Sequence, residues 1–102
     1  MIQSEIEGRP MEVAKEVARL AREILGHGVE VTWFGSWPQG RAQPHSDIDM
    51  AVSAARPIPP EQFAVLRNAA DDLPTLYSIE LLDLASAGQS LRNEILRHGV
   101  RL

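Results

Sequence analysis

The chain has 102 residues, of which 44% are hydrophobic and 24% charged, and its formal net charge is −4. This length and composition suit one globular domain with a small core. A net negative charge argues against an extended nucleic-acid-binding surface, which needs many basic side chains along one face. The absence of cysteine excludes a disulfide framework and a thiolate metal site.

The sequence also gives no sign of a membrane segment or of a leader. No apolar run approaches the roughly 20 residues that a membrane span requires. Residues 1–10 are too polar for a signal peptide. We therefore expect a cytoplasmic protein with no membrane partner.

The first predicted element is a helix over residues 10–25. Pro10 suits the first helical position, and Gly26 and Gly28 end the helix. Apolar residues fall on one stripe with helical spacing, namely Val13, Val17, Leu20, Ala21 and Ile24.

Two strands follow, joined by a loop. Residues 29–34 are rich in β-branched and aromatic side chains, which predicts a short strand that stops at Gly35 and Ser36. Prolines and glycines punctuate residues 37–46, so we expect a loop there. Residues 47–52 alternate between apolar and other side chains, which predicts a second strand with both of its aspartates on one face.

The second half of the chain adds two helices and a strand. We expect a helix over residues 61–73, whose inner face carries Phe63, Leu66, Ala70 and Leu73, and a strand over residues 77–82. Ser86 and Gln89 form a capping-box pattern before a last helix, which ends near His98 with Gly99 as its C-cap. The predicted fold is α/β (α+β), with helices packed on one small mixed sheet in a single domain over residues 1–102.

The candidate site lies between residues 34 and 52. Asp47 and Asp49 are two residues apart on a predicted strand, so their Cβ atoms are about 6–7 Å apart on one face. Two carboxylates at that spacing repel each other unless a cation lies between them, and Mg²⁺ prefers a few carboxylates together with phosphate oxygens. Gly35 lets the backbone approach a ligand closely, and Ser36 adds a hydroxyl that can hold phosphate. A nucleoside triphosphate with its metal ions joins the two ends of this segment.

A third carboxylate is expected from the third predicted strand. Glu80 and Asp83 are three residues apart, so a regular strand points them to opposite faces. Tyr77, Ile79 and Leu81 read as core, which leaves Glu80 as the better ligand or general base and Asp83 as a cap for the next turn. The simpler alternatives are that Glu80 is an ordinary exposed residue and that the two aspartates lie on a solvated strand edge.

These residues resemble a known family. Gly35-Ser36, ten further residues and then Asp47-Ile48-Asp49 match the G-S-x10-D-x-D signature of the DNA polymerase β-like nucleotidyltransferase superfamily. The order of elements is also similar, and a chain this short resembles the minimal nucleotidyltransferases (MNT), which often act as antitoxins beside a HEPN-domain toxin. The segments "VTWFGSW", "HSDIDMAV", "IELLDL" and "LRNEILRHGVRL" all look familial.

The resemblance implies a polymerase β-like fold and a magnesium-dependent transfer of AMP from ATP to a tyrosine hydroxyl of the toxin, in a hetero-oligomer. It implies that Asp47, Asp49 and Glu80 are catalytic and hold two Mg²⁺ ions, and that Gly35, Ser36 and Arg41 bind the nucleotide. The sequence departs from the family in two places. The third acid is Glu rather than Asp, and Trp37 and Gln39 occupy positions where many relatives carry arginine.

Two other functions fit the same chain. One is an antitoxin that neutralises its partner by contact, with little or no catalysis. The other is transfer of a nucleotide to a small molecule such as an aminoglycoside, which usually needs a second domain. Arg41 is as compatible with solvent exposure as with phosphate binding, and Trp37 suits packing better than stacking on a base.

Overall fold

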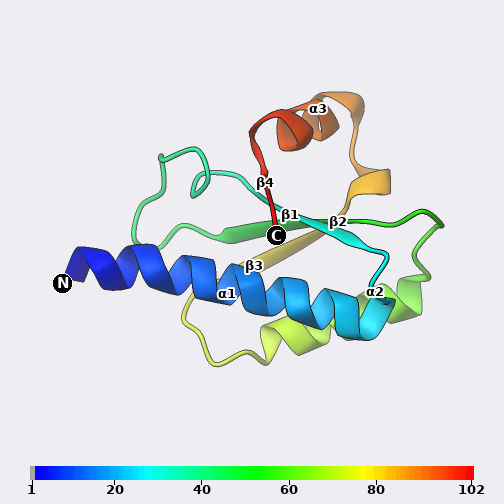
Figure 1. Cartoon of the computed structure of the whole chain (residues 1–102), viewed down its shortest axis with the longest axis horizontal. Coiled ribbons are helices and arrows are strands. Elements are labelled where there is room, and N and C mark those ends of the chain that lie inside the picture. The colour runs from blue at the N-terminus through cyan, green and yellow to red at the C-terminus, as the bar shows by residue number, and fades with distance from the viewer. Residues whose placement is uncertain (1) are drawn as a thin grey trace.

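A four-stranded mixed sheet with helices on both faces forms the centre of the molecule (Figure 1). The computed structural model describes residues 2–102, with side chains from residue 9 onward. The helices are α1 (Ile2–Leu25), α2 (Pro60–Asp71) and α3 (Gln89–His98), with a 3₁₀ turn, η1 (Leu84–Ser86), before α3. The strands are β1 (Glu30–Phe34), β2 (Ile48–Ser53), β3 (Ile79–Asp83) and β4 (Val100–Arg101).

The strand order is β3-β2-β1-β4, so β2 and β1 are the central strands. β1 pairs antiparallel with β2 and with β4, whereas β2 and β3 run parallel and are connected through α2. This confirms the expected mixed sheet with helices packed on it.

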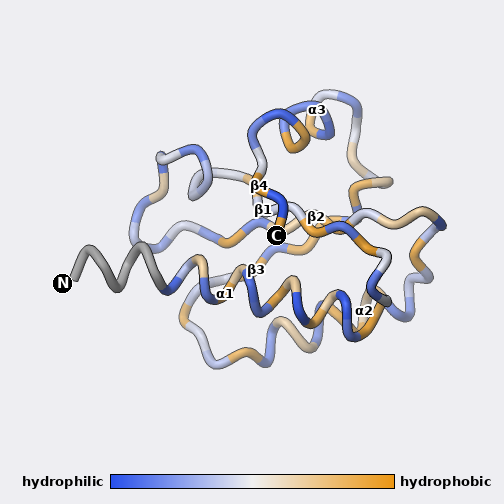
Figure 2. The backbone as a smooth tube through the Cα atoms, viewed as in Figure 1, coloured by the Kyte–Doolittle hydropathy of each residue, from blue (hydrophilic) through white to orange (hydrophobic). Residues whose placement is uncertain are grey.

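The two faces of the sheet pack against different helices. Helices α1 and α2 cover one face, where the main core contains Val17, Val31, Ile48, Met50 and Leu66 (Figures 1 and 2). On the other face α3 and η1 form a smaller cluster, in which Ile95 and Leu84 pack against Ala51. The predicted apolar stripes of α1 and α2 are confirmed, because every residue named for them is buried or packs against the main core.

Several predicted boundaries are wrong, and each has a local cause. Helix α1 begins well before Pro10, which lies inside the helix with its ring buried, so the helix continues at the cost of one backbone hydrogen bond. Strand β2 begins at Ile48, one residue after Asp47. Strand β3 begins at Ile79 because the Tyr77 amide donates to the Thr75 hydroxyl (3.1 Å) in a local turn.

The predicted capping box does not form. Ser86 belongs to η1, and the N-cap of α3 is Gly88, which has no side chain to accept a hydrogen bond. Asp83 caps η1 instead, because its Oδ1 accepts from the Ala85 amide at 3.1 Å. Strand β4 was not predicted, since two residues carry too little pattern to identify a strand.

Gly26 and Gly99 end their helices as predicted, but for different reasons. Gly26 adopts a φ of 103°, which favours glycine. At Gly99 the reason is space, because a Cβ there would lie 2.4 Å from Cγ2 of Thr32 and 2.6 Å from the Ile95 carbonyl oxygen. None of the described helices has the length and apolar character of a membrane-spanning segment.

Candidate active site

The sheet brings two of the predicted acidic residues, Asp49 and Glu80, to one face. In the β1–β2 register Phe34 lies opposite Asp49, and in the β2–β3 register Asp49 lies opposite Glu80. Paired residues on adjacent strands project to the same side and lie about 5 Å apart. Asp49 therefore has Glu80 as its direct cross-strand neighbour, on the face opposite α1 and α2.

The three carboxylates differ in their exposure. Asp49 is half-buried, whereas Asp47 and Glu80 are exposed. Burial, and after it the negative charges of Asp47 and Glu80, together raise the pKa of Asp49 to about 6. Asp49 therefore sits at a point of uncompensated negative charge, which a divalent cation would offset.

Gly35, directly after β1, lies against the Asp49 carboxylate. Its φ of 85° requires glycine, and a Cβ there would lie 2.3 Å from Oδ2 of Asp49 and 3.2 Å from its Cγ. The chain therefore turns directly above the Asp49 carboxylate. A ligand that touches the turn also approaches the acid.

The loop that follows carries Ser36 and Arg41. The Arg41 amide donates to the Ser36 carbonyl (2.9 Å), which closes the loop after the Gly-Ser turn. The exposed Arg41 guanidinium donates to Oε1 of Gln39 (2.9 and 3.2 Å), so its side chain lies along the loop. Its contact with phosphate stays a prediction.

Trp37 anchors this loop by packing, the role that the sequence favoured for it. Its indole Nε1–H donates to the Ser46 carbonyl (3.1 Å), next to Asp47. Its ring also packs edge-on against Tyr77, with ring centroids 6.0 Å apart. Trp37 therefore connects the Gly-Ser turn, the first aspartate and the segment before β3. The packing alternative for Trp37 is the one that the structure supports.

Within the described residues, no group of three or more His, Asp or Glu side chains is arranged to hold a metal ion. Asp47 and Glu80 both act on the charge of Asp49, but these two residues are exposed. The donor set suits Mg²⁺ in its chemistry, because hard carboxylate oxygens flank a turn that is accessible to phosphate. The roles of Asp47, Asp49 and Glu80 as ligands stay a prediction.

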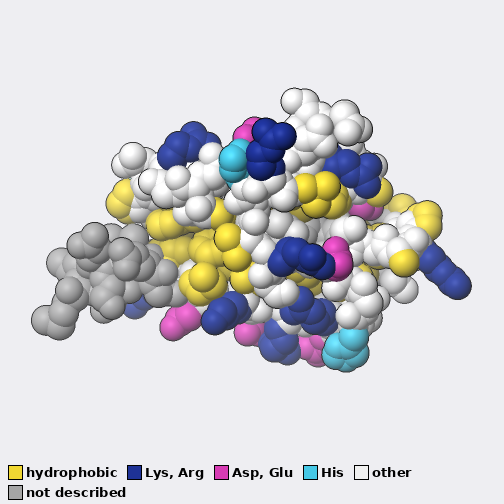
Figure 3. Space-filling view, turned by 45° about the horizontal axis from the view of Figure 1, so that its top comes forward, with side chains coloured by type: hydrophobic (Ala, Val, Ile, Leu, Met, Phe, Trp, Pro, Cys, Tyr) yellow, Lys and Arg dark blue, Asp and Glu magenta, His cyan; other side chains and the backbone are white. Residues whose placement is uncertain are grey.

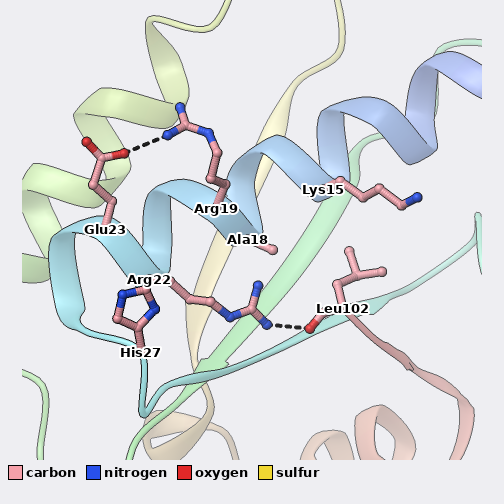
Figure 4. Close-up of a pocket in the computed structure, with 7 residues that line it drawn as sticks. All are labelled: Lys15, Ala18, Arg19, Arg22, Glu23, His27 and Leu102. Atoms are coloured by element: carbon pink, nitrogen blue, oxygen red, sulfur yellow. Dashed lines mark hydrogen bonds and ion pairs between the residues drawn. The ribbon is translucent and has the colours of Figure 1, made fainter.

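A separate pocket of about 700 Å³ lies on α1 and contains none of these residues (Figure 4). Arg19 donates there to Glu23 (2.7 Å), and Arg22 donates to the Leu102 carbonyl. On the face that Figure 3 shows, basic and acidic side chains are interspersed rather than gathered in one basic patch. The candidate site is therefore defined by the Gly-Ser turn and the acids, and not by the pocket of Figure 4.

Comparisons with known proteins agree with this geometry. The family model described as "Polymerase beta, Nucleotidyltransferase" matches residues 29–102, which include the turn and all three acids. No curated protein sequence is significantly similar to the chain.

Several solved structures are similar to the chain, among them the following three. A crystal structure of a toxin-antitoxin with AMP-PNP has a TM-score of 0.69 and 28% identity, covering 86% of this chain and 70% of that one. A tri-AMPylated Shewanella oneidensis HEPN toxin in complex with an MNT antitoxin has a TM-score of 0.67 and 22% identity, covering 90% and 70%. A protein named as a candidate minimal nucleotidyltransferase has a TM-score of 0.70 and 23% identity, covering 91% and 95%.

At 22% and 23% identity, the last two structures show only that the fold is shared. The family is shown by the family model, which matches most of this chain. The Gly-Ser turn, the three acids and all four strands lie within the matched segment. The chain belongs to the polymerase beta nucleotidyltransferase family.

Proposed function

We propose that this chain is an antitoxin that transfers AMP from ATP to a tyrosine hydroxyl of a HEPN-family toxin. The observation that carries the proposal is the contact between the Gly35 turn and the Asp49 carboxylate, with Asp47 and Glu80 beside it. Membership of the nucleotidyltransferase family supports the reaction class. The similar complex of an AMPylated HEPN toxin with an MNT antitoxin supports a HEPN toxin as the partner that receives AMP.

In this proposal different residues bind different parts of the substrate. Gly35 and Ser36 hold triphosphate oxygens through backbone amides and the hydroxyl, and Arg41 turns from Gln39 to add a cation. Asp47, Asp49 and Glu80 would hold two Mg²⁺ ions. Magnesium would supply the positive charge that the carboxylates and phosphates need in order to lie side by side.

The transfer step uses one nucleophile and one leaving group. The acceptor oxygen forms a bond to the α-phosphorus of ATP, and the bond from that phosphorus to the oxygen bridging to the β-phosphate breaks. Pyrophosphate leaves with the electron pair of that bond, while the acceptor proton passes to the Glu80 carboxylate. An exposed glutamate on an edge strand is accessible to a hydroxyl brought by another protein.

A second function is favoured by a specific observation. Asp47 and Glu80 are exposed, and no ready three-ligand metal group exists among the described residues. An antitoxin that neutralises its toxin by contact needs no such group. The two proposals differ in whether neutralisation depends on the acids.

The experiment combines the chain, labelled ATP, Mg²⁺ and the product of the adjacent gene. Wild-type protein is compared with Asp47→Asn/Asp49→Asn and with the matched control Asp71→Asn/Asp72→Asn, which removes two exposed acids from the end of α2. Label on the partner with wild type and the control, but not with the site variant, supports the transferase. Neutralisation that survives the site substitutions without label supports the contact antitoxin.

A further inference from the structure

The loop between β1 and β2 is bonded to itself close to the acids, and Trp37 makes the contact. The loop extends from one end of the sheet (Figure 1). The Trp37 indole Nε1–H donates to the Ser46 carbonyl oxygen at 3.1 Å, so the residue after the Gly-Ser turn holds the residue before Asp47. The Ser46 end of the loop is itself ordered. Its amide donates to the Gln43 carbonyl (3.0 Å), and its hydroxyl accepts from the Gln43 amide (2.8 Å).

Asp47 depends on this loop in a way that Asp49 and Glu80 do not. Asp49 and Glu80 lie within β2 and β3, where the register of the sheet fixes them opposite each other. Asp47 is exposed and precedes β2, so it takes no part in the pairing of that strand. Its position is therefore set by the contacts of its neighbours along the chain.

Two hydrogen bonds fix the backbone on either side of Asp47. After it, the Ile48 amide donates to the Ser78 carbonyl at 2.8 Å, where β2 meets the segment that leads into β3. Before it, the Ser46 carbonyl accepts from the Trp37 indole. The first bond continues the sheet, whereas the second is made by a side chain. The indole contact is therefore the one that a substitution can remove without changing the strands.

The Trp37 ring is itself oriented by the segment before β3. It packs edge-on against Tyr77, with ring centroids 6.0 Å apart and an angle of 89° between the ring planes. Both rings are partly buried and pack against the main core. An edge-to-face aromatic pair prefers a defined geometry, so the Tyr77 contact keeps the indole N–H directed at Ser46.

Asp47 needs such a contact because its negative charge acts on Asp49. Like charges repel, and an exposed residue outside a strand can move away to relieve the repulsion. The carboxylate would then have to return before one cation could bind both aspartates, which would weaken the binding of that cation.

From this arrangement we propose that Trp37 is a positioning residue, whose indole N–H holds Asp47 beside Asp49 so that both carboxylates are assembled before a divalent cation binds. The inference rests on the metal site of the proposed function and adds to it a residue that acts through the backbone. General packing of the loop is the competing explanation, and removal of one N–H group separates the two.

The test removes the N–H group and keeps the ring. Trp37 is replaced by β-(3-benzothienyl)alanine, in which sulfur takes the place of the indole N–H, and in a second protein by phenylalanine (Trp37→Phe). The matched control is the same pair of replacements at Trp33, whose ring lies in the main core on the other face of the sheet. Within the part of the chain that the structure describes, Nε1 of Trp33 has no hydrogen-bond partner. The control therefore removes an N–H group without breaking a hydrogen bond.

The measurement is the affinity for Mn²⁺, followed by electron paramagnetic resonance without nucleotide or partner. We expect both replacements of Trp37 to weaken Mn²⁺ binding about tenfold, as changes to groups that orient metal ligands do. The thermal midpoint of the benzothienyl protein should fall by no more than about 8 °C, the effect of one hydrogen bond. Both replacements of Trp33 should leave the Mn²⁺ affinity unchanged, although Trp33→Phe lowers the thermal midpoint by leaving a space in the core.

A double-mutant cycle identifies the acid through which Trp37 acts. In the Asp47→Asn background, Trp37→Phe should cause no further loss of Mn²⁺ affinity, because the ligand that it positions is already gone. In the Glu80→Gln background it should again weaken binding about tenfold. In the transfer assay, Trp37→Phe should raise the Mg²⁺ concentration for half-maximal rate and leave the rate at saturating Mg²⁺ near that of wild type.

The outcomes separate this inference from the proposed function. Unchanged Mn²⁺ affinity in both Trp37 proteins would overturn it, and so would an equal loss in the Asp47→Asn background, which would show that Trp37 only stabilises the loop. Either result leaves the transferase standing, because the reaction needs only the acids. Wild type that binds Mn²⁺ but transfers no AMP would remove the proposed transfer and leave the positioning role intact. Wild type that binds no Mn²⁺ at millimolar concentrations would remove the metal site together with its positioning residue.

Discussion

A Cβ added to Gly35 would lie 2.3 Å from the carboxylate oxygen Oδ2 of Asp49, so the turn after β1 and the acid of β2 share one contact surface. The relationship follows from the antiparallel register, in which Phe34 is paired with Asp49 and the next residue folds over it. The Gly-Ser turn, which is proposed to bind phosphate, therefore lies directly against the Asp49 carboxylate. Only the hydrogen of glycine fits between them.

Gly35→Ala is expected to reduce both stability and transfer. Its φ of 85° costs a non-glycine residue about 1–3 kcal/mol, and the methyl group also displaces Asp49. A displacement of about 1 Å at reacting groups costs about 100-fold in rate. Chemical denaturation and AMP transfer measure the two effects.

Gly40→Ala is the control for that variant. Gly40 has a φ of 71°, but nothing lies within 4 Å of its added Cβ, so it carries the backbone strain without the clash. We expect a similar loss of stability and nearly normal transfer. Equal rates for the two variants would show that the contact with Asp49 has no role in the reaction.

Stability without metal is expected to depend on the titration of Asp49. The pKa of this carboxyl is raised to about 6 by burial and then by Asp47 and Glu80, while the unfolded chain titrates near 4. Between these values the folded state holds the proton that the unfolded state releases, so the free energy of unfolding falls as pH rises from about 4 to about 6. Urea denaturation in a metal chelator, at a series of pH values, measures this slope.

Asp49→Asn isolates that contribution. In the variant, the fall in the free energy of unfolding between about pH 4 and 6 that comes from Asp49 should disappear. The variant should also be more stable than wild type at pH 7.5, because it removes a partly buried charge. Parallel curves for the two proteins would contradict the raised pKa. In wild type, magnesium binding should release a proton, so the affinity falls about tenfold for each pH unit below about 6.

Glu80→Gln is expected to lower transfer by about 10²–10⁴-fold, because an amide cannot accept the acceptor's proton. The exposed side chain makes no packing contribution to lose, so the thermal midpoint should stay near wild type. Asp83→Asn is the control, since asparagine retains the oxygen that accepts from the Ala85 amide at the end of the same strand. A normal rate in Glu80→Gln would remove this residue from the site.

Gly99→Ala is expected to destabilise the fold by about 1–3 kcal/mol, as overpacking does in a tight interior. The methyl group would contact both Thr32 and the Ile95 carbonyl, where α3 turns into β4. Gly28→Ala, at an exposed position in the turn after α1, has open space around the added Cβ and no left-handed φ, so it should change stability by less than about 0.5 kcal/mol. Comparable denaturation midpoints for the two variants would contradict the close approach.

The local patterns predicted most of the elements because each must bury one apolar face. The stripe on α1 and the alternation along β2 assigned their buried residues before any packing was known. The failures lie where the pattern is short or ambiguous. Pro10 suits a helix start as well as a tolerated interior position, the serine before α3 belongs to an intervening turn, and β4 is only two residues long.

By itself, the sequence determined which chemical groups are present and how they are spaced along the chain. The Gly-Ser pair, the two aspartates and the strand that carries Asp49 are local features, since their spacing is read from the sequence without reference to the rest of the protein. Only the tertiary structure decided that Glu80 lies opposite Asp49 and that Trp37 anchors the loop. Register and loop packing depend on contacts between elements far apart in the chain, and no local pattern specifies them.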